Sequence, residues 1–158
     1  MTDPVYHLRQ AAPEDAPVLA YQRRAMFAAM RWVEADEHAA LENASRTQIE
    51  RAIIAGSFVA WLVECDGRPV AGGGMLLRAL MPRPGFLDGG TEGYLLSMWT
   101  EPEHRRKGLA TRIVRAALDW CRERGIGRVS LHASDEGRLV YQRLGFASTN
   151  EMRLHLNR

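Results

Sequence analysis

Three cations stand side by side at Arg105, Arg106 and Lys107, directly before Gly108 and a stretch with helical periodicity. A helix N-terminus presents backbone N–H groups without intrahelical partners and carries about half a positive charge. A glycine at such a turn lets a ligand approach the backbone closely. Together these features predict a site for a strongly anionic group such as a diphosphate. The alternative is a cluster of basic residues that only faces solvent.

Other short motifs lack the spacing that their chemistry needs. No G-x-x-x-x-G-K-[ST] phosphate loop is present, and the glycine run in "AGGGM" (71–75) predicts a bulge or a close backbone contact inside a strand. The segment "HASDEG" (132–137) contains His, Ser and Asp, but neighbours on one strand do not converge as a triad and no G-x-S-x-G elbow exists. We therefore exclude a serine hydrolase. Cys65 and Cys121 form neither a disulfide framework nor a set of metal ligands, and the helical position of Cys121 predicts core packing.

The elements that must position the basic loop alternate between strands and helices. The order predicts an α/β fold, with a mixed (α+β) sheet flanked by helices in one domain. The predicted strands cover 5–11, 93–100 and 126–133, with a last strand or hairpin arm over 146–156. A predicted hairpin over 57–80 has two strands that are joined by a turn at Asp66–Gly67. The predicted helices cover 13–30, 45–55, 107–124 and 135–144.

Composition excludes several classes of function. A chain of 158 residues with 46% apolar residues suits one domain with a substantial core. A net charge of +2 is too small to indicate nucleic-acid binding. The N-terminal "MTDPVYHLRQ" lacks the apolar region of a secretory signal, and no apolar run approaches the ~20 residues of a membrane span. We expect a cytoplasmic protein that binds neither membrane nor nucleic acid.

Two motifs together resemble a known family. Arg105-x-x-Gly108-x-Ala110, followed by a helix, a strand and "LVYQRLGF", resembles the GNAT superfamily of acyl-CoA-dependent N-acetyltransferases. In that superfamily the pyrophosphate-binding loop has the pattern [QR]-x-x-G-x-[GA], and a later helix carries the pattern L-Y-x-x-x-G-F. The opening "LRQAAPEDAPVLA" also resembles its first strand and helix. The resemblance implies a single N-acetyltransferase-like domain over 1–158, with a central, mostly antiparallel sheet whose strands splay.

The resemblance also implies acetyl-CoA as the acyl donor and no metal. The backbone amides from Arg106 to Ala110 would hold the pyrophosphate, and the backbone of the strand before the loop would pair with pantetheine. Ser134 stands where an Asn is common in the family, so its hydroxyl either contacts the coenzyme or caps the helix that follows. The implied coenzyme-binding residues are Met98, Trp99, Thr100, Arg105, Arg106, Lys107, Gly108, Leu109, Ala110 and Ser134.

Acid and base roles follow from the same resemblance. Tyr141 matches the position that often protonates the departing thiolate, and a phenol with a pKa near ~10 can donate to a thiolate with a pKa near ~8.5. An alkyl ammonium with a pKa near ~10.4 must lose a proton before it attacks. Glu92, which shares a strand face with Tyr94 where some members carry glutamate, is our first candidate for the base, ahead of Glu103 and His132.

The acceptor site would form from the first two helices, their connection and the loop over 81–91. The implied lining residues are Met26, Phe27, Met30 and Trp32, with Glu34, Asp36 and Glu37 available to attract a cationic amine. Met26 and Met30 are four residues apart, which is also typical of core packing, and we expect at least one of them in the core. The acceptor would be a primary amine of a small molecule or peptide that attacks the thioester directly in a ternary complex. The sequence leaves open whether the protein forms a homodimer through its last strand.

Two other functions are compatible with the chain. A catalytically inactive acyl-CoA-binding sensor would bind the thioester without turnover against any amine. A nucleic-acid-binding module would use the cations at 105–107, but no recognition helix with interleaved aromatic residues accompanies them.

Overall fold

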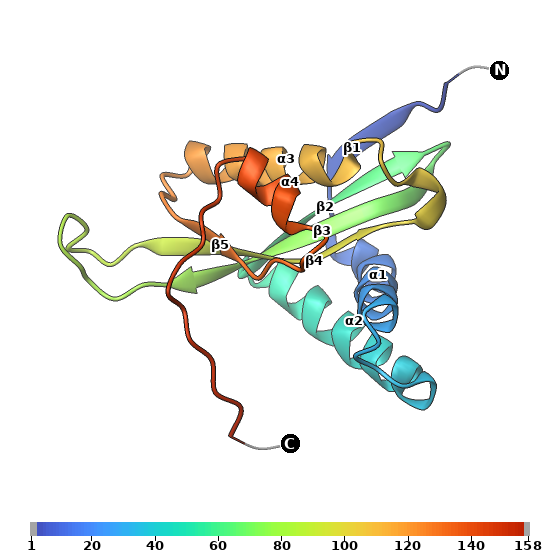
Figure 1. Cartoon of the computed structure of the whole chain (residues 1–158), viewed down its shortest axis with the longest axis horizontal. Coiled ribbons are helices and arrows are strands. Elements are labelled where there is room, and N and C mark those ends of the chain that lie inside the picture. Colours follow the sequence, from blue (N-terminus) through green and yellow to red (C-terminus); the bar gives the residue numbers. More distant parts are fainter. Residues whose placement is uncertain (1–2, 157–158) are drawn as a thin grey trace.

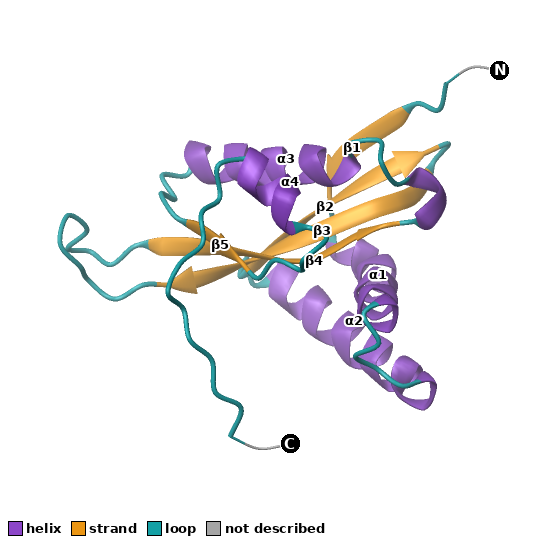
Figure 2. Cartoon of the chain, in the orientation of Figure 1, coloured by secondary structure: helices purple, strands orange, loops and turns teal. Residues whose placement is uncertain are grey.

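A computed structural model describes residues 3–156 of the chain. One five-stranded sheet separates two helical layers, with α1 and α2 on one face and α3 and α4 on the other (Figures 1 and 2). The elements are β1 (Tyr6–Gln10), the 3-10 turn η1 (Pro13–Asp15), α1 (Ala16–Ala29), η2 (Ala35–Glu37), α2 (His38–Ile54), β2 (Phe58–Cys65), β3 (Arg68–Ala79), β4 (Thr91–Thr100), η3 (Pro102–His104), α3 (Leu109–Glu123), β5 (Val129–Leu131) and α4 (Arg138–Arg143). The predicted mixed sheet flanked by helices is confirmed.

The sheet is antiparallel from β1 to β4 and parallel only between β4 and β5. The parallel ladder is short, because Gly93–Leu95 of β4 pairs with Val129–Leu131 of β5 and no further. Beyond Leu95, β4 continues to Thr100 along β3 alone. The two strands therefore separate over the second half of β4, which confirms the mostly antiparallel, splayed sheet.

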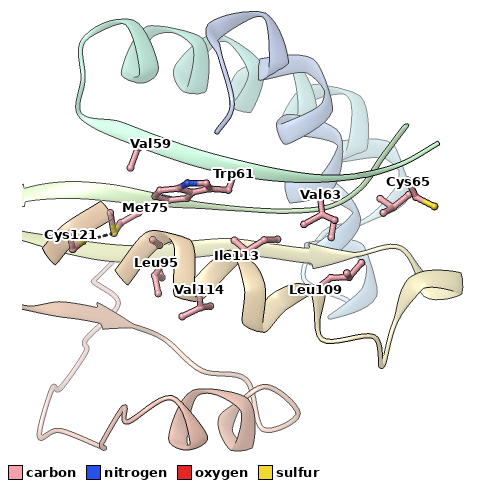
Figure 3. Packing of buried hydrophobic residues seen from close by; sticks show 13 residues of the cluster. Val59, Trp61, Val63, Cys65, Met75, Leu95, Leu109, Ile113, Val114 and Cys121 are labelled. Atoms are coloured by element: carbon pink, nitrogen blue, oxygen red, sulfur yellow. Dashed lines mark hydrogen bonds between the residues drawn. The ribbon is translucent and has the colours of Figure 1, made fainter. Parts of the chain in front are cut away.

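The larger core lies between the sheet and α3. The apolar row of α3 points toward the sheet in Figure 3, where Ile113 and Val114 face Val63, Met75 and Leu95. Each of these five side chains is buried. Cys121 ends the same row and is buried as predicted. This packing fixes the helix, and with it the loop at the start of the helix, against the middle of the sheet.

The glycine run of β3 admits three close contacts. A Cβ on Gly72 would collide with the side chain of Gln22, one on Gly73 with Met98, and one on Gly74 with Phe58. At the same place the register of β3 against β4 shifts between Gly72 and Gly74. The prediction of a bulge or close backbone contact is thus confirmed in both forms.

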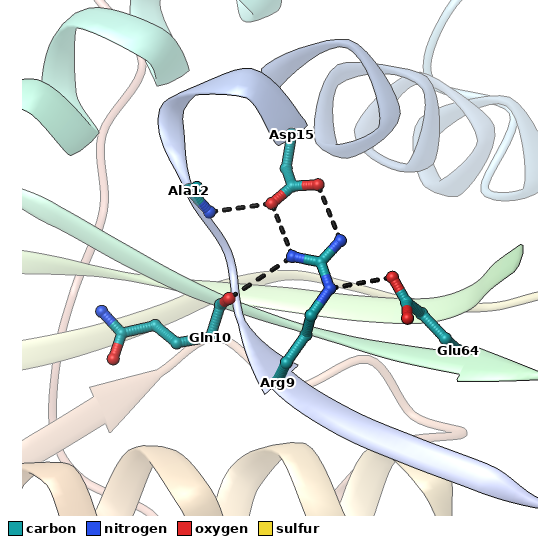
Figure 4. A network of polar contacts seen from close by, with 5 residues as sticks. All are labelled: Arg9, Gln10, Ala12, Asp15 and Glu64. Carbon is teal, nitrogen blue, oxygen red and sulfur yellow. Dashed lines mark hydrogen bonds and ion pairs between the residues drawn. The ribbon is translucent and has the colours of Figure 1, made fainter. Parts of the chain in front are cut away.

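Arg9 ties the end of β1 to the start of the first helix (Figure 4). Its Nη1 and Nη2 groups donate to both carboxylate oxygens of Asp15, at 2.7 and 2.9 Å, and its Nε group donates to Glu64 of β2 at 2.8 Å. Asp15 also accepts the N–H of Ala12 at 2.8 Å. The hydrogen bonds from Arg9 hold the pKa of the Asp15 carboxyl below its ordinary value. This network sets the direction in which α1 crosses the sheet.

The structure agrees with the predicted hairpin turn and differs from prediction at the start of α2 and at the C-terminal segment. Asp66 and Gly67 both have positive φ, as a type I′ turn requires. α2 begins at His38 and not at residue 45, where the predicted helix starts. The predicted strand over 146–156 is wrong: the segment pairs with no described strand, and the alternating Met152, Leu154 and Leu156 stay exposed. Within residues 3–156, no helix is both long and apolar enough to cross a bilayer.

Candidate active site

A cavity of about 830 Å³ opens where β4 and β5 separate. Its walls come from α1, the second half of β4, the end of β5 and the turn before α4. This volume lies within the ~300–1,000 Å³ that ligand sites usually have. Of the predicted site residues, the cavity brings together Met26, Phe27, Met30, Trp32, Met98, Trp99, Thr100, Arg105, Ser134 and Tyr141.

A bulge in β4 turns the strand's backbone toward this cavity. Ser97 has φ of 58°, in the left-handed region that non-glycine residues rarely occupy. The register shift on β3 faces it, and the Met98 side chain fills the space above Gly73. The side chain of Met98 thus packs toward the core, and residues 96–100 all line the cavity. Backbone groups that no longer pair with β5 are available to an extended ligand.

The basic loop connects β4 to α3 at one end of the cavity. Arg106 and Gly108 have positive φ, of 60° and 73°, on either side of Lys107. Such alternation gathers backbone N–H groups into a concave anion-binding loop. α3 then begins at Leu109 without a side-chain cap, so its first N–H groups, including that of Ala110, have no intrahelical partner. A Cβ on Gly108 would meet open space, so a ligand can reach the backbone there.

Two of the three cations are held over aromatic rings. The Arg105 guanidinium lies 5.0 Å from the ring centre of Trp99, and its Nε group donates to the Thr100 carbonyl at 3.0 Å. The Lys107 ammonium lies 5.7 Å from the ring of Tyr6. Among the described residues, none of the three cations forms an ion pair with an acid. Their charges and the free N–H groups together fit a diphosphate.

Tyr141 lies on α4 and lines the cavity. Its ring packs edge-on against Phe146, with ring centres 5.9 Å apart. Burial raises the pKa of its hydroxyl above the ordinary 10.0. The phenol therefore holds its proton at neutral pH, as a general acid must.

Ser134 lies in the turn before α4, whose own N-cap residue is Gly137 and has no side-chain cap. The Oγ of Ser134 accepts the N–H of Gly137 at 3.1 Å, in the turn that leads into α4. Ser134 also lines the cavity, and its O–H remains a donor that can point into the cavity. The structure thus does not make Ser134 the N-cap of α4, and its contact with the coenzyme stays a prediction.

The predicted acceptor residues form one wall of the cavity. Phe27 and Trp32 stack with ring centres 6.0 Å apart, and Trp32 is 67% exposed. Met26 and Met30 line the cavity and belong to neither buried cluster, so the expectation that one of them lies in the core is wrong. None of the acids of 34–37 lines the cavity. The charged residues Arg23, Asp135, Glu136 and Arg153 also line the cavity and were not predicted; in the case of Arg23, nothing in the sequence distinguishes it from Arg24.

The structure argues against Glu92 as the base. Its side chain is 6% exposed, and both of its oxygens are engaged, one by Arg78 and the other by Arg128 and Ser130. Burial raises the pKa of this carboxyl, but the hydrogen bonds from Arg128 and Arg78 outweigh it and hold the pKa below its ordinary value. Glu92 also lies six residues before Met98, about 20 Å along the strand, and lines no cavity found at this face. The geometry fits an ion-pair cluster.

The other base candidates differ in position. His132 lines the large cavity together with Tyr141, and both also line a neighbouring cavity of about 530 Å³ beside α4 and the C-terminal segment. Glu103 lines neither cavity. His132 is thus the predicted candidate that the fold brings near Tyr141.

Comparisons with known proteins agree with this geometry. The family model described as acetyltransferase (GNAT) family matches residues 20–146. A GCN5-related N-acetyltransferase from Ralstonia eutropha is 28% identical, with a TM-score of 0.85 over 96% of this chain and 99% of that one. A predicted acetyltransferase with acetyl-CoA from Clostridium acetobutylicum is 26% identical, with a TM-score of 0.83 over 97% and 96% of the two chains.

A more distant likeness extends to the fold alone. Glucosamine-6-phosphate N-acetyltransferase from Arabidopsis thaliana is 18% identical, with a TM-score of 0.69 over 97% of this chain and 99% of that one. None of the curated proteins compared with the chain matches it.

Proposed function

The chain belongs to the acetyltransferase (GNAT) family, and from this premise we propose that it transfers an acetyl group from acetyl-CoA to a primary amine of a small molecule or peptide. One observation carries the proposal. Arg105 at the start of the basic loop, residues 94–100 of the bulged strand β4 and the half-buried Tyr141 all line one cavity, and the anion-binding loop continues from Arg105 into the start of α3.

The residues of the loop and of β4 bind and orient the donor. The N–H groups from Arg106 to Ala110 hold the pyrophosphate, and Arg105 and Lys107 add charge. The main chain of Met98, Trp99 and Thr100 pairs with pantetheine where β5 has moved away. When bound, acetyl-CoA supplies the thioester that an amine attacks. Holding donor and acceptor in one cavity converts a bimolecular reaction into an effectively unimolecular one.

Two side chains move protons in the proposed reaction. The acceptor ammonium first gives up a proton to become the attacking amine, and His132, at the same cavity, accepts this proton directly or through water. As the new N–C bond forms and the C–S bond breaks, the phenol of Tyr141 donates its proton to the departing sulfur, and the second proton lost by the nitrogen returns to the phenolate through water. Glu92 does not take this role in the proposal, because its oxygens are engaged by arginines.

A calorimetric titration with acetyl-CoA tests the donor site. The matched variants are Gly108→Glu and Gly125→Glu, because both glycines have positive φ, face open space and lie at opposite ends of α3. The two variants therefore introduce the same backbone strain and the same charge, and they differ only in where these lie. We expect micromolar binding by the wild type and by Gly125→Glu, and a loss of about a hundredfold or more for Gly108→Glu.

Either of two results would overturn the proposal. Folded wild-type protein that binds no acetyl-CoA removes its basis, as does a Gly108→Glu variant that binds like wild type. Binding without acetyl transfer to any primary amine would instead identify an acyl-CoA-binding sensor.

A further inference from the structure

Arg23 is a cation at the cavity wall without an acidic partner. It lies on α1, is half-buried and lines the cavity. Its Nη1 group donates to the Ser97 hydroxyl at 2.7 Å, and its guanidinium lies 4.8 Å from the ring centre of Phe27. Among the described residues it forms no ion pair, whereas the adjacent Arg24 pairs with Glu42 at 3.0 Å.

Burying such a group is unfavourable unless something compensates for it. Burial lowers the pKa of Arg23, yet a guanidinium stays charged in a protein. A neutral hydroxyl and an aromatic face offset only part of the desolvation cost. A carboxylate is the partner that a guanidinium matches best, through two parallel N–H···O bonds. With Nη1 engaged by Ser97, the Nε and Nη2 edge remains for such a ligand.

The surroundings of Arg23 define what else the ligand carries. Phe27, which the guanidinium overlies, stacks on Trp32, and Met26 and Met30 extend this apolar wall. Ser97, which holds Arg23, directly precedes Met98, and both residues line the cavity at the bulge. An anion on Arg23 therefore lies beside Met98, Trp99 and Thr100, the residues that the proposed function assigns to pantetheine. The other charged residues of the lining come from different elements: Arg105 belongs to the basic loop, Arg153 pairs with Glu151 at 3.6 Å, and the acids Asp135 and Glu136 can attract an ammonium group.

We propose that the acceptor amine carries a carboxylate, which pairs with Arg23, and an apolar group, which packs on Phe27 and Trp32. An α-amino acid with an aromatic or aliphatic side chain has this chemistry, since one carbon separates its carboxylate from its amine. A single guanidinium matches the single charge of a carboxylate. The inference rests on the proposed function, because it names the acceptor of the same site.

The test compares ligands that differ only in the charge. N-acetyl-L-phenylalanine and its amide, and the same pair built on leucine, are product-like probes that need no turnover to bind. Their affinities are measured by calorimetry with free coenzyme A present. We expect the wild type to bind the carboxylate of at least one pair about tenfold or more tightly than the amide. Arg23→Met should abolish this preference, and Arg24→Met, which changes the neighbouring residue outside the cavity, should keep it.

The outcomes separate the inference from the proposed function. Acetyl-CoA affinity and the thermal melt are recorded for each variant, and Arg23→Gln replaces Arg23→Met if the latter does not fold. If acetyl-CoA binds normally but carboxylate and amide bind equally, or neither binds, the carboxylate inference is wrong while the donor site stands. A preference that persists in the Arg23 variants also overturns it. Failure of acetyl-CoA itself to bind overturns the proposed function.

Discussion

Tyr141 shows how one residue divides its functions between ring and hydroxyl. The ring packs against Phe146, and the hydroxyl has a raised pKa because it is buried. We expect Tyr141→Phe to lower kcat by about 10²- to 10⁴-fold. The affinity for acetyl-CoA should change less than about twofold, since the ring is retained. Steady-state kinetics beside calorimetry would check this, and an unchanged kcat would remove the acid role.

The pH profile gives an independent check on the same residue. A raised pKa places the midpoint of the phenol's ionisation above its ordinary value of 10.0. The loss of activity caused by ionisation of Tyr141 should therefore have its midpoint above pH 10. Any earlier alkaline decline that persists in Tyr141→Phe belongs to another group.

Glu92 and His132 lead to opposite expectations. Glu92→Gln leaves Arg78 and Arg128 without their shared carboxylate, and we expect it to lower the free energy of unfolding by about 1–3 kcal/mol. The two arginines are about half exposed, which limits the loss. The kcat of the folded variant should stay within about twofold of wild type. His132→Asn should instead lower kcat with little change in the melt, and the reverse pattern would restore Glu92 as the base.

At the scale of elements, the close approach of β3 and β4 supports the bulge. Gly73→Ala places a methyl group against Met98 and within 3.2 Å of Ile113. We expect a loss of about 1–3 kcal/mol in the free energy of unfolding from overpacking. Weaker acetyl-CoA binding should accompany it, because displaced Met98 moves the bulge that borders the cavity. Gly127→Ala is the matched control, since a Cβ there meets nothing within 4 Å.

Elements with strong local signals were predictable, whereas those that depend on distant partners were not. α3 lies within two residues of its predicted limits, because an apolar row runs between two glycines. The segment over 146–156 has a strand's alternation but no neighbouring strand among the described residues to pair with. The periodicity of apolar residues specifies which face of an element a side chain occupies, but it does not specify which other element packs against that face.

The same dependence on distant partners determines which residues of the candidate site could be predicted from the sequence. The loop at 105–110 and Tyr141 could be proposed as site residues from short motifs, because each motif lies within one continuous segment of the chain. The environment of Glu92 could not, since Arg128 comes from a segment 36 residues away. Arg23 and Arg24 are neighbours of one type, and only the packing of α1 sends one to the cavity and the other to Glu42.

For the whole molecule, two carboxylates link stability to acid. The pKa of Asp15 and that of Glu92 are both below their ordinary values of 3.8 and 4.5. Their contribution is present above those ordinary values and is lost as the pH falls through the lower folded-state values. Urea unfolding should therefore show stability falling steadily below about pH 4.5. Asp15→Asn and Glu92→Gln together should flatten this decline, whereas the exposed Glu123→Gln should not.

The three-residue ladder between β4 and β5 has a further consequence, for the lifetime of the protein. So short a ladder leaves β5 as a locally weak part of the sheet, open to exchange and to proteases. A donor lying across the gap would close it and stabilise the fold by mass action, by about 2.7 kcal/mol at a hundred times its Kd. Proteolysis near β5 should then slow as acetyl-CoA is added, and slow far less in Gly108→Glu. The supply of acyl donor would thereby regulate how long each copy survives as well as how fast it works.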